Sequence, residues 1–251
     1  GSWNYALGAD HSAGGVSFGA DVTSSSGSPV VVGQMFGPVM FGSTTHQVAV
    51  LDGFVAKANP SGNGWAWSSV FQTVANQSTD NSNPAAATVD SNGDVIVAGN
   101  FKGETDFGGT TFNVSSTEVF VAKLNGSNGD LQWVVTGGGI GDQIITDVVV
   151  TSSGIIHVSG VTQSQVFFGT NSYTPVGTQD SFVLTLSSAG AFQSIEGYGI
   201  ANQVVVVRNL AVDTSGVLYV GGTFSGTLSK NTWSITANKG GSDIFVIKNG
   251  A

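Results

Sequence analysis

Residues 118–133 read EVFVAKLNGSNGDLQW, and residues 52–67 read DGFVAKANPSGNGWAW, which is nearly the same pattern. In both segments an acidic residue is followed two positions later by Phe, and the segment ends in Trp. The acid–Phe pair occurs twice more, as DSF at residues 180–182 and as DIF at residues 243–245. The Phe residues therefore stand at positions 54, 120, 182 and 245, with spacings of 66, 62 and 63 residues. Such regular spacing indicates an internal repeat.

A second landmark precedes each acid–Phe pair. It is a β-branched run that follows a Gly turn and ends in Gly: SSSGSPVVVG, DSNGDVIVAG, TSSGIIHVSG and DTSGVLYVGG, ending at Gly33, Gly99, Gly160 and Gly222. Turns of this chemistry between β-branched runs predict β-hairpins. No segment shows the apolar periodicity of an amphipathic helix. Each repeat is therefore predicted to contain about four antiparallel strands, A to D.

Repeated units of four antiparallel strands are typical of the blades of a β-propeller. The repeat places the blades at about residues 16–71, 84–136, 146–198 and 207–251. The fourth blade lacks a D strand, whereas SWNYALGADH at the N-terminus resembles one. We therefore predict an all-β, four-bladed propeller, a single domain of residues 1–251, in which residues 1–9 complete the fourth blade beside residues 243–248. This closure would cover two sheet edges that otherwise favour aggregation.

Residues 92–133, NGDVIVAGNFKGETDFGGTTFNVSSTEVFVAKLNGSNGDLQW, resemble the bacterial β-propeller repeat called the SBBP repeat. The other units resemble it too, the third most loosely because Ile195 replaces the Trp, so the resemblance covers essentially the whole chain. It implies a secreted or cell-surface bacterial propeller whose shared motifs are structural, without a catalytic residue set. The family name refers to seven blades, and four units are present here. This leaves a ring of four blades within one chain, an assembly with a second chain such as an eight-bladed ring, or a part of a larger ring. The complementary ends favour the first.

Composition excludes several classes of function. Charged residues make up 9% of the chain, the net charge is −9, and Lys and Arg together number 7 and are scattered singly. A nucleic-acid backbone would therefore find no basic stripe. No run approaches about 18 apolar residues, so no membrane insertion is expected. The chain has no Cys, which excludes disulfides and thiolate metal sites. Because few side chains are charged, few pairs of titratable residues could act together in catalysis. We therefore expect neither an enzyme nor a cofactor.

The acids that precede each Phe are better explained as parts of the repeat than as a ring of ligands. They are predicted to accept hydrogen bonds beside strand C: Asp52, Glu118, Asp180 and Asp243.

Three other motifs resemble functional sites. DSNGD at residues 90–94 lacks the distal Glu of a calcium loop and is predicted to be a turn. GVSFG at residues 15–19 matches the pattern around a nucleophilic serine but enters a strand rather than a helix. His11, His46 and His157 occupy unrelated repeat positions, so no metal site is predicted.

Large side chains recur at two repeat positions and are predicted to pack between blades. They are Phe41, Phe107, Phe168 and Leu228 at the first position, and His46, Phe112, Tyr173 and Trp233 at the second. Tyr5, Trp65 and Tyr198 have no such counterpart and are freer to be exposed. Exposed aromatic rings among polar residues are what a sugar-binding patch offers.

The loop after strand D carries a polar pair in every repeat. In a propeller this loop lies near the axis, so the four pairs are predicted to form a collar around the channel mouth: Asp10 and His11, Asn76 and Gln77, Asp142 and Gln143, and Asn202 and Gln203. Amides both donate and accept hydrogen bonds, which suits sugar hydroxyls. The same groups are equally suited to hydrogen bonds between blades.

These observations favour a non-catalytic extracellular module for binding or adhesion, which recognises a glycan, another surface polymer or a surface protein at this face. The alternative is a passive spacer or a protein-interaction scaffold within a larger bacterial surface protein. A binding module is expected to show a concave polar or aromatic patch, and a spacer is not.

Overall fold

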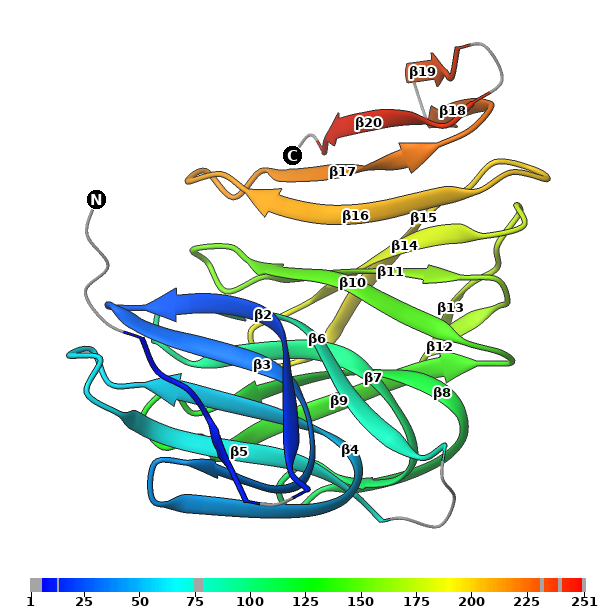
Figure 1. Cartoon of the computed structure of the whole chain (residues 1–251). Coiled ribbons are helices and arrows are strands. Elements are labelled where there is room, and N and C mark those ends of the chain that lie inside the picture. Colours follow the sequence, from blue (N-terminus) through cyan, green and yellow to red (C-terminus); the bar gives the residue numbers. More distant parts are fainter. Residues whose placement is uncertain (1–5, 13, 75–78, 231–232, 239–240, 250–251) are drawn as a thin grey trace. The chain divides into compact units, whose positions relative to one another are not determined.

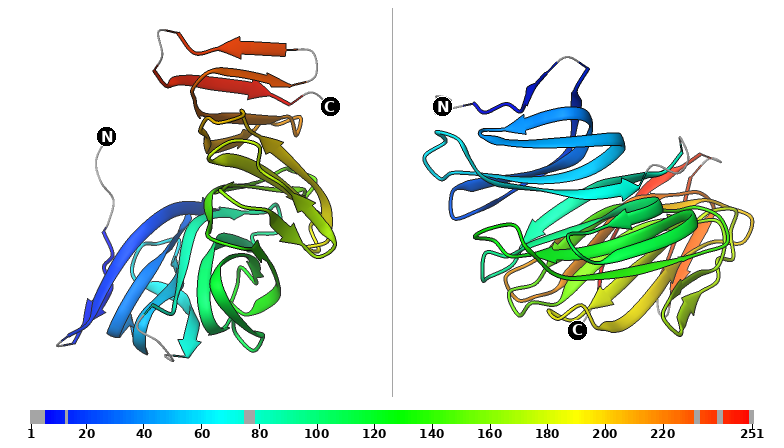
Figure 2. Two further views of the ribbon diagram at one scale, coloured as in Figure 1. Left: turned by 90° about the vertical axis from the view of Figure 1, so that its right-hand side faces the viewer. Right: turned by 90° about the horizontal axis from the view of Figure 1, so that it is seen from below.

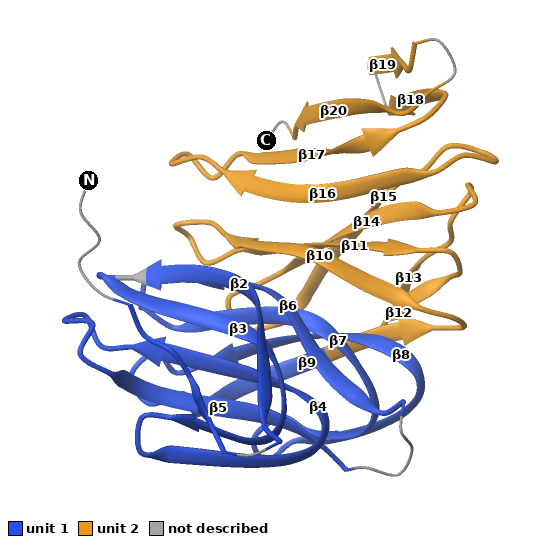
Figure 3. Ribbon diagram, viewed as in Figure 1, with its two compact units in different colours: residues 1–135 blue, residues 136–251 orange. Residues whose placement is uncertain are grey.

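The computed structural model describes residues 6–12, 14–74, 79–230, 233–238 and 241–249. Throughout these residues the regular structure is β-strand and no helix occurs, which confirms the all-β prediction (Figure 1). In this part of the chain, accordingly, no helix exists that is long and apolar enough to cross a membrane. The chain divides into two compact units, residues 1–135 and residues 136–251 (Figure 3).

The first meander, in the first unit, is an antiparallel array in which each strand pairs with the next along the chain. Its strands are β2 (Val16–Ser25), β3 (Ser28–Phe41), β4 (Thr44–Ala58) and β5 (Trp65–Val74). These four strands lie side by side in all views (Figures 1 and 2).

The second meander repeats this order of pairing and belongs to the first unit up to residue 135, within its last strand. Its strands are β6 (Asn81–Val89), β7 (Val95–Asp106), β8 (Thr111–Leu124) and β9 (Leu131–Gly139). The end of β5 pairs with the end of β7, so the two meanders share backbone hydrogen bonds at residues 72–74 and 104–106.

The second unit contains the third meander, built from β10 (Gln143–Val150), β11 (Ile156–Thr162), β14 (Asp180–Leu186) and β15 (Phe192–Tyr198). The fourth meander has three strands, β16 (Val205–Val212), β17 (Leu218–Phe224) and β20 (Asp243–Lys248). Between strands B and C of these meanders lie two short hairpins, β12 (Val166–Phe168) with β13 (Asn171–Tyr173), and β18 (Thr227–Lys230) with β19 (Trp233–Thr236). The last residues of β9, Gly138 and Gly139, pair with β12.

A β-bulge occurs at the same place in strand A of every meander, and it explains the repeated Gly of strand B. The register shifts at residues 19–21, 84–86, 145–147 and 207–209. A β-bulge brings an extra residue of one strand against its partner. Opposite the bulge, a Cβ at Gly33 would lie 1.9 Å from the Phe18 carbonyl oxygen, and one at Gly99 would lie 2.2 Å from that of Asn83. Only glycine fits there.

The bulge also orients an acid that links neighbouring meanders. In the first unit Asp21 Oδ2 accepts a hydrogen bond of 2.9 Å from the Ala87 backbone N–H. In the second unit Asp147 Oδ2 accepts one of 2.7 Å from the N–H of Leu210, which has the same repeat position as Ala87. In each unit, therefore, a carboxylate at the bulge of one strand A accepts a backbone hydrogen bond from strand A of the next meander.

The core of the first unit is built on the repeated Phe residues. Phe120 is fully buried, and its ring centroid lies 4.9 Å from that of Phe107 and 5.2 Å from that of Phe71. Phe71 belongs to the first meander and the other two to the second, so these rings pack between meanders as predicted for Phe107. Edge and tilted ring pairs of this kind add about 0.5–1.5 kcal/mol to the burial of apolar area.

The other members of that series, Phe41, Phe168 and Leu228, are also buried. The aromatic residues without repeat counterparts behave differently from the prediction. Tyr198 is buried in the core of the second unit, so the expectation that it is exposed is wrong. Trp65 is half-buried, and Tyr5 lies outside the described residues.

The predicted pairing of residues 1–9 with β20 remains a prediction. Residues 1–5 lie outside the described residues, and residues 6–9 form no strand. The carbonyl oxygen of Gly8 accepts a hydrogen bond of 3.1 Å from Trp65 Nε1. The next two residues form β1 (Asp10–His11), which pairs with Val39 and Met40 of β3.

Candidate functional site

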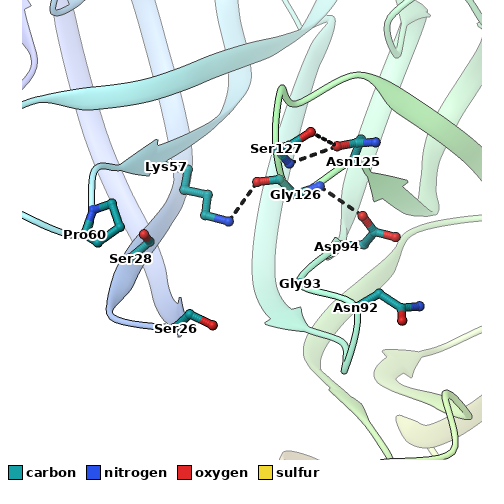
Figure 4. A pocket seen from close by; sticks show the side chains of 10 residues that line it. All are labelled: Ser26, Ser28, Lys57, Pro60, Asn92, Gly93, Asp94, Asn125, Gly126 and Ser127. Carbon is teal, nitrogen blue, oxygen red and sulfur yellow. Dashed lines mark hydrogen bonds between the residues drawn. The ribbon is translucent and has the colours of Figure 1, made fainter.

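A polar cleft opens in the first unit where turns of the first two meanders meet. It has a volume of about 450 Å³. Four turns contribute its lining, the A–B and C–D turns of each meander (Figure 4): Ser26, Ser28, Lys57, Pro60, Asn92, Gly93, Asp94, Asn125, Gly126 and Ser127. Every side chain in this set is polar or charged except Pro60 and the two glycines.

The A–B turn of the first meander is a tight two-residue turn. Ser25 pairs with Ser28, and the residues between them, Ser26 and Gly27, have φ values of 50° and 80°. Two successive residues with positive φ define the type I′ turn that suits the twist of a β-hairpin. The equivalent turn of the second meander is one residue longer, because Asp90 lies opposite Asp94 there, with the Gly93 N–H donating to the Asp90 carbonyl oxygen.

Gly126 forms the rigid back wall of the cleft. Its carbonyl oxygen accepts hydrogen bonds from Lys57 Nζ at 2.8 Å and from Trp67 Nε1 at 3.2 Å. Its N–H donates to Asp94 Oδ1 at 3.0 Å. A Cβ here would lie 1.7 Å from the Gly93 carbonyl oxygen, so no larger residue fits. The wall is therefore fixed by contacts to both meanders.

On the second meander the acids of the turn neutralise a buried lysine. Lys123 Nζ lies 2.7 Å from Asp90 Oδ2 and 3.3 Å from Asp94 Oδ2. Burial alone would raise the pKa of Asp94, but the hydrogen bond from Gly126 and the nearby Lys123 ammonium outweigh it and lower that pKa below its usual value. Burial alone would likewise lower the pKa of Lys123. Its hydrogen bonds to Asp90 and Asp94 outweigh the effect of burial, so the pKa of Lys123 lies above its usual value. Both groups are thus held in their charged forms.

Lys57 has the same repeat position as Lys123, and its surroundings differ. The turn beside it reads SSSGS at residues 24–28 instead of DSNGD at residues 90–94. Among the described residues Lys57 forms no ion pair, and its ammonium donates to the Gly126 carbonyl oxygen across the cleft. An ammonium has three donors, so this hydrogen bond leaves Lys57 able to donate further.

Hydroxyl, amide and ammonium groups together give this cleft donors and acceptors over its whole lining. Such a surface can form hydrogen bonds with hydroxyl-rich molecules. The arrangement is therefore suited to binding a polar molecule.

None of the residues of the predicted collar lines this cleft, and those in the first unit are only partly described. Asp10 and His11 are exposed in β1, and His11 Nε2 lies 3.0 Å from Ser17 Oγ. Asn76 and Gln77 lie outside the described residues.

In the second unit the collar residues fall into two groups. Asp142 and Asn202 are exposed, and Asn202 has a positive φ of 59°. Gln143 is fully buried at the start of β10. Gln203 is half-buried, and its Oε1 accepts a hydrogen bond of 3.0 Å from Ser225 Oγ, which belongs to the next meander. Gln203 therefore forms a hydrogen bond to the next meander, and ligand contact by the collar remains a prediction.

The repeated acids accept hydrogen bonds, as predicted, in three of the four meanders. Asp180 accepts from the Tyr173 hydroxyl and from two backbone N–H groups, and Asp243 accepts from the Asn238 N–H at 2.7 Å. Asp52 accepts from the Thr73 N–H at 3.0 Å, but its other oxygen is buried without a partner. Burial raises the pKa of Asp52 to about 6.

Two other motifs, DSNGD and GVSFG, have the structures predicted for them. DSNGD forms a turn, in which Asp90 Oδ1 accepts from the N–H groups of Asn92 and Asp94. GVSFG lies at the start of β2, with Ser17 inside the strand. In the described part of the chain, no group of three or more His, Asp and Glu residues could hold a metal ion.

Comparison of the chain with protein-family models and with curated proteins gives no match. The likeness to the SBBP repeat therefore remains an expectation based on the residues quoted for it. Sequence reasoning also missed the cleft. The sequence does carry a signal for the cleft. The other two repeats that have the lysine, as FVAK or FVIK, also have an Asp in their A–B turn, whereas the first repeat has the lysine and the turn SSSGS, which contains no acid.

Proposed function

We propose that this protein is a non-catalytic binding module that takes a polar glycan in the cleft of its first unit. The observation that carries the proposal is the lining of the cleft, in which serine, asparagine and lysine side chains from four turns surround a fixed wall at Gly126. Sugar hydroxyls both donate and accept hydrogen bonds, and these groups complement them. A secreted or cell-surface location in bacteria is part of the proposal and rests on the resemblance to the SBBP repeat.

A titration with sugars tests this function. The labelled protein is titrated with a panel of neutral and acidic mono- and oligosaccharides while backbone amide shifts are recorded by NMR. We expect shifts at Gly93, Gly126 and Ser127, with dissociation constants around the millimolar range for one shallow site. Useful adhesion would then depend on several copies presented together.

Two other outcomes of that titration have distinct meanings. Shifts confined to Asp142, Asn202 and Gln203, abolished by Asn202→Ala, would move the binding site to the predicted collar. A protein that binds none of the sugars would overturn the glycan proposal and favour the passive spacer.

We propose further that the four meanders are the blades of a four-bladed propeller closed within one chain. Apolar residues on the first and the fourth meanders support this. Val246 is 74% exposed, whereas the valines at its repeat position, Val55, Val121 and Val183, are at most 2% exposed. On strand A, Val22 is 64% exposed, whereas its counterparts Ala87, Val148 and Leu210 are at most 7% exposed. Apolar residues that three repeats bury and one exposes indicate a face that is covered in the complete assembly.

The closure is tested with Val246→Asp. A charge placed on a covered face should cost several kcal/mol, while at an exposed site the change should cost less than about 0.5 kcal/mol. Val176→Asp is the matched control, because Val176 is also exposed and lies in a loop of the same unit. Equal small losses for both variants would overturn the ring. A mass in solution of two chains, converted to one by Val246→Asp, would replace it with a ring shared between two chains.

A further inference from the structure

The cleft contains a cation that its own repeat fails to neutralise. Strand C carries Lys57, Lys123, Thr185 and Lys248 at one repeat position. Lys123 forms ion pairs with Asp90 and Asp94 of its own A–B turn. Lys248 is near enough to Asp213 of its own turn to lower the pKa of that carboxyl, after the stronger effect of the Val217 N–H. The first meander keeps the lysine and has no acid in the turn beside it.

The one carboxylate in the lining does not compensate for this. Asp94 is committed to the N–H of Gly126 through Oδ1 and to Lys123 through Oδ2. In the cluster of Lys123 with Asp90 and Asp94 two carboxylates face one ammonium, so that cluster offers no positive charge to a ligand and keeps one net negative charge. Lys57 is the cation of the cleft lining, and among the described residues it forms no ion pair of its own. It is half-buried, and a half-buried ammonium interacts with an anion more strongly than one in bulk water does.

We propose that Lys57 recognises the carboxylate of an acidic sugar, such as a uronic acid residue of a polysaccharide. This rests on the proposed glycan-binding function and names the class of sugar. The ammonium donates to the carboxylate while Asn92 and Ser127 bond to the ring hydroxyls. A single lysine matches a single negative charge. A phosphate dianion carries about twice that charge and would lie near Asp94, so the cleft favours a carboxylate.

The experiment compares glucuronic acid, its neutral methyl ester and glucose, each titrated into the wild-type protein and four variants. In the wild type we expect the acid to bind about tenfold more tightly than the ester or glucose, the effect of one charge-assisted hydrogen bond in a partly buried site. Lys57→Gln should remove this preference and leave the weak binding of glucose. Lys102→Gln, which changes a lysine outside the cleft, should leave the preference intact.

The remaining two variants separate charge from shape. Ser28 has the repeat position of Asp94, so Ser28→Asp should give Lys57 the kind of partner that Lys123 has and abolish the preference for the acid. Ser28→Asn has nearly the same shape without the charge and should keep the preference. The two side chains have nearly the same shape, and only Asp carries a charge that can pair with Lys57. A difference in preference between these two variants therefore reports the neutralisation of Lys57.

Each outcome decides the proposal. Equal binding of acid, ester and glucose in the wild type, or a preference for the acid that survives Lys57→Gln, would overturn the role of Lys57 and leave the glycan function standing. Failure of all three sugars to bind would overturn both. Binding of inorganic sulfate or phosphate that depends on Lys57, without any binding of sugar, would overturn the assignment of an acidic sugar.

Discussion

The second and the fourth meanders contain nearly the same strand C in different surroundings. The strand reads EVFVAKL at residues 118–124 and DIFVIKN at residues 243–249. Phe120 and Phe245 are buried in both. On the other face Val119 and Val121 are covered, whereas Ile244 and Val246 are among the most exposed apolar residues described. The conformation of strand C depends on its own residues, whereas the groups that cover its other face come from neighbouring strands.

The largest effect that separates these two strands is expected from removing their Phe rings. Phe120→Ala should cost about 3–5 kcal/mol in the free energy of unfolding, as is usual for a buried aromatic residue. Phe245→Ala should cost less, because Phe245 pairs with one ring, Phe224, at 6.0 Å, whereas Phe120 packs against three. Urea unfolding of both variants measures the difference. A loss below about 1 kcal/mol for Phe120→Ala would contradict the burial of the repeated Phe.

A second effect is expected from the lysines that follow them. Lys123→Met should leave Asp90 and Asp94 without their buried cation and should cost about 2–4 kcal/mol. Lys248→Met is the matched variant, and because Lys248 is exposed it should cost less than about 0.5 kcal/mol. Thermal or urea unfolding at neutral pH compares them. Equal losses would mean that the pair of Lys123 behaves like a surface salt bridge.

The acids before each Phe should give a smaller effect that depends on pH. Burial raises the pKa of Asp52 to about 6, so the folded protein holds this proton more tightly than the unfolded chain does. Its contribution to stability is therefore greatest below the unfolded pKa, near 4, and is lost as the pH rises through about 6. Asp52→Asn should raise the free energy of unfolding at pH 7 by about 1–2 kcal/mol and flatten its slope between pH 4 and 6.

Asp243→Asn is the control for this change. Asp243 is half-buried and accepts the Asn238 N–H, so its substitution should cost about 0.5–1 kcal/mol through a weaker hydrogen bond. Unfolding of both variants between pH 4 and 8 provides the measurement. A stability of Asp52→Asn that falls at pH 7 would show that the Asp52 carboxylate is compensated in the folded state.

Much of the fold could be predicted because its signals are local. The turn glycines, the β-branched runs and the acid–Phe pairs located the strands of the first three meanders and the three strands of the fourth. The glycine of strand B was recognised as a landmark, and the bulge opposite it supplies the reason. Turn chemistry and steric exclusion at a backbone act between residues that pair directly, so the sequence carries them.

The site was harder to predict because it depends on residues far apart in the chain. Asn202 and Gln203 stood out because they recur, yet Gln203 bonds to Ser225 of the next meander. Lys57 looked like one more copy of FVAK. What distinguishes it is the hydrogen bond from its ammonium to the Gly126 carbonyl oxygen, which lies 69 positions along the chain. The sequence does contain the substitution of SSSGS for DSNGD, but its meaning requires the partners of Lys123.

The sequence by itself determined that this chain is all-β, where most of its strands and turns lie, and that the repeated Phe residues are buried. Each of these follows from short-range patterns of side-chain direction and backbone conformation. The tertiary structure alone decided that Lys57 faces a cleft while Lys123 is neutralised, that one oxygen of Asp52 is buried without a partner, and that Val121 is covered while Val246 is exposed. Charge and burial depend on the groups that neighbouring meanders bring close, and identical residues acquire different properties when those neighbours differ.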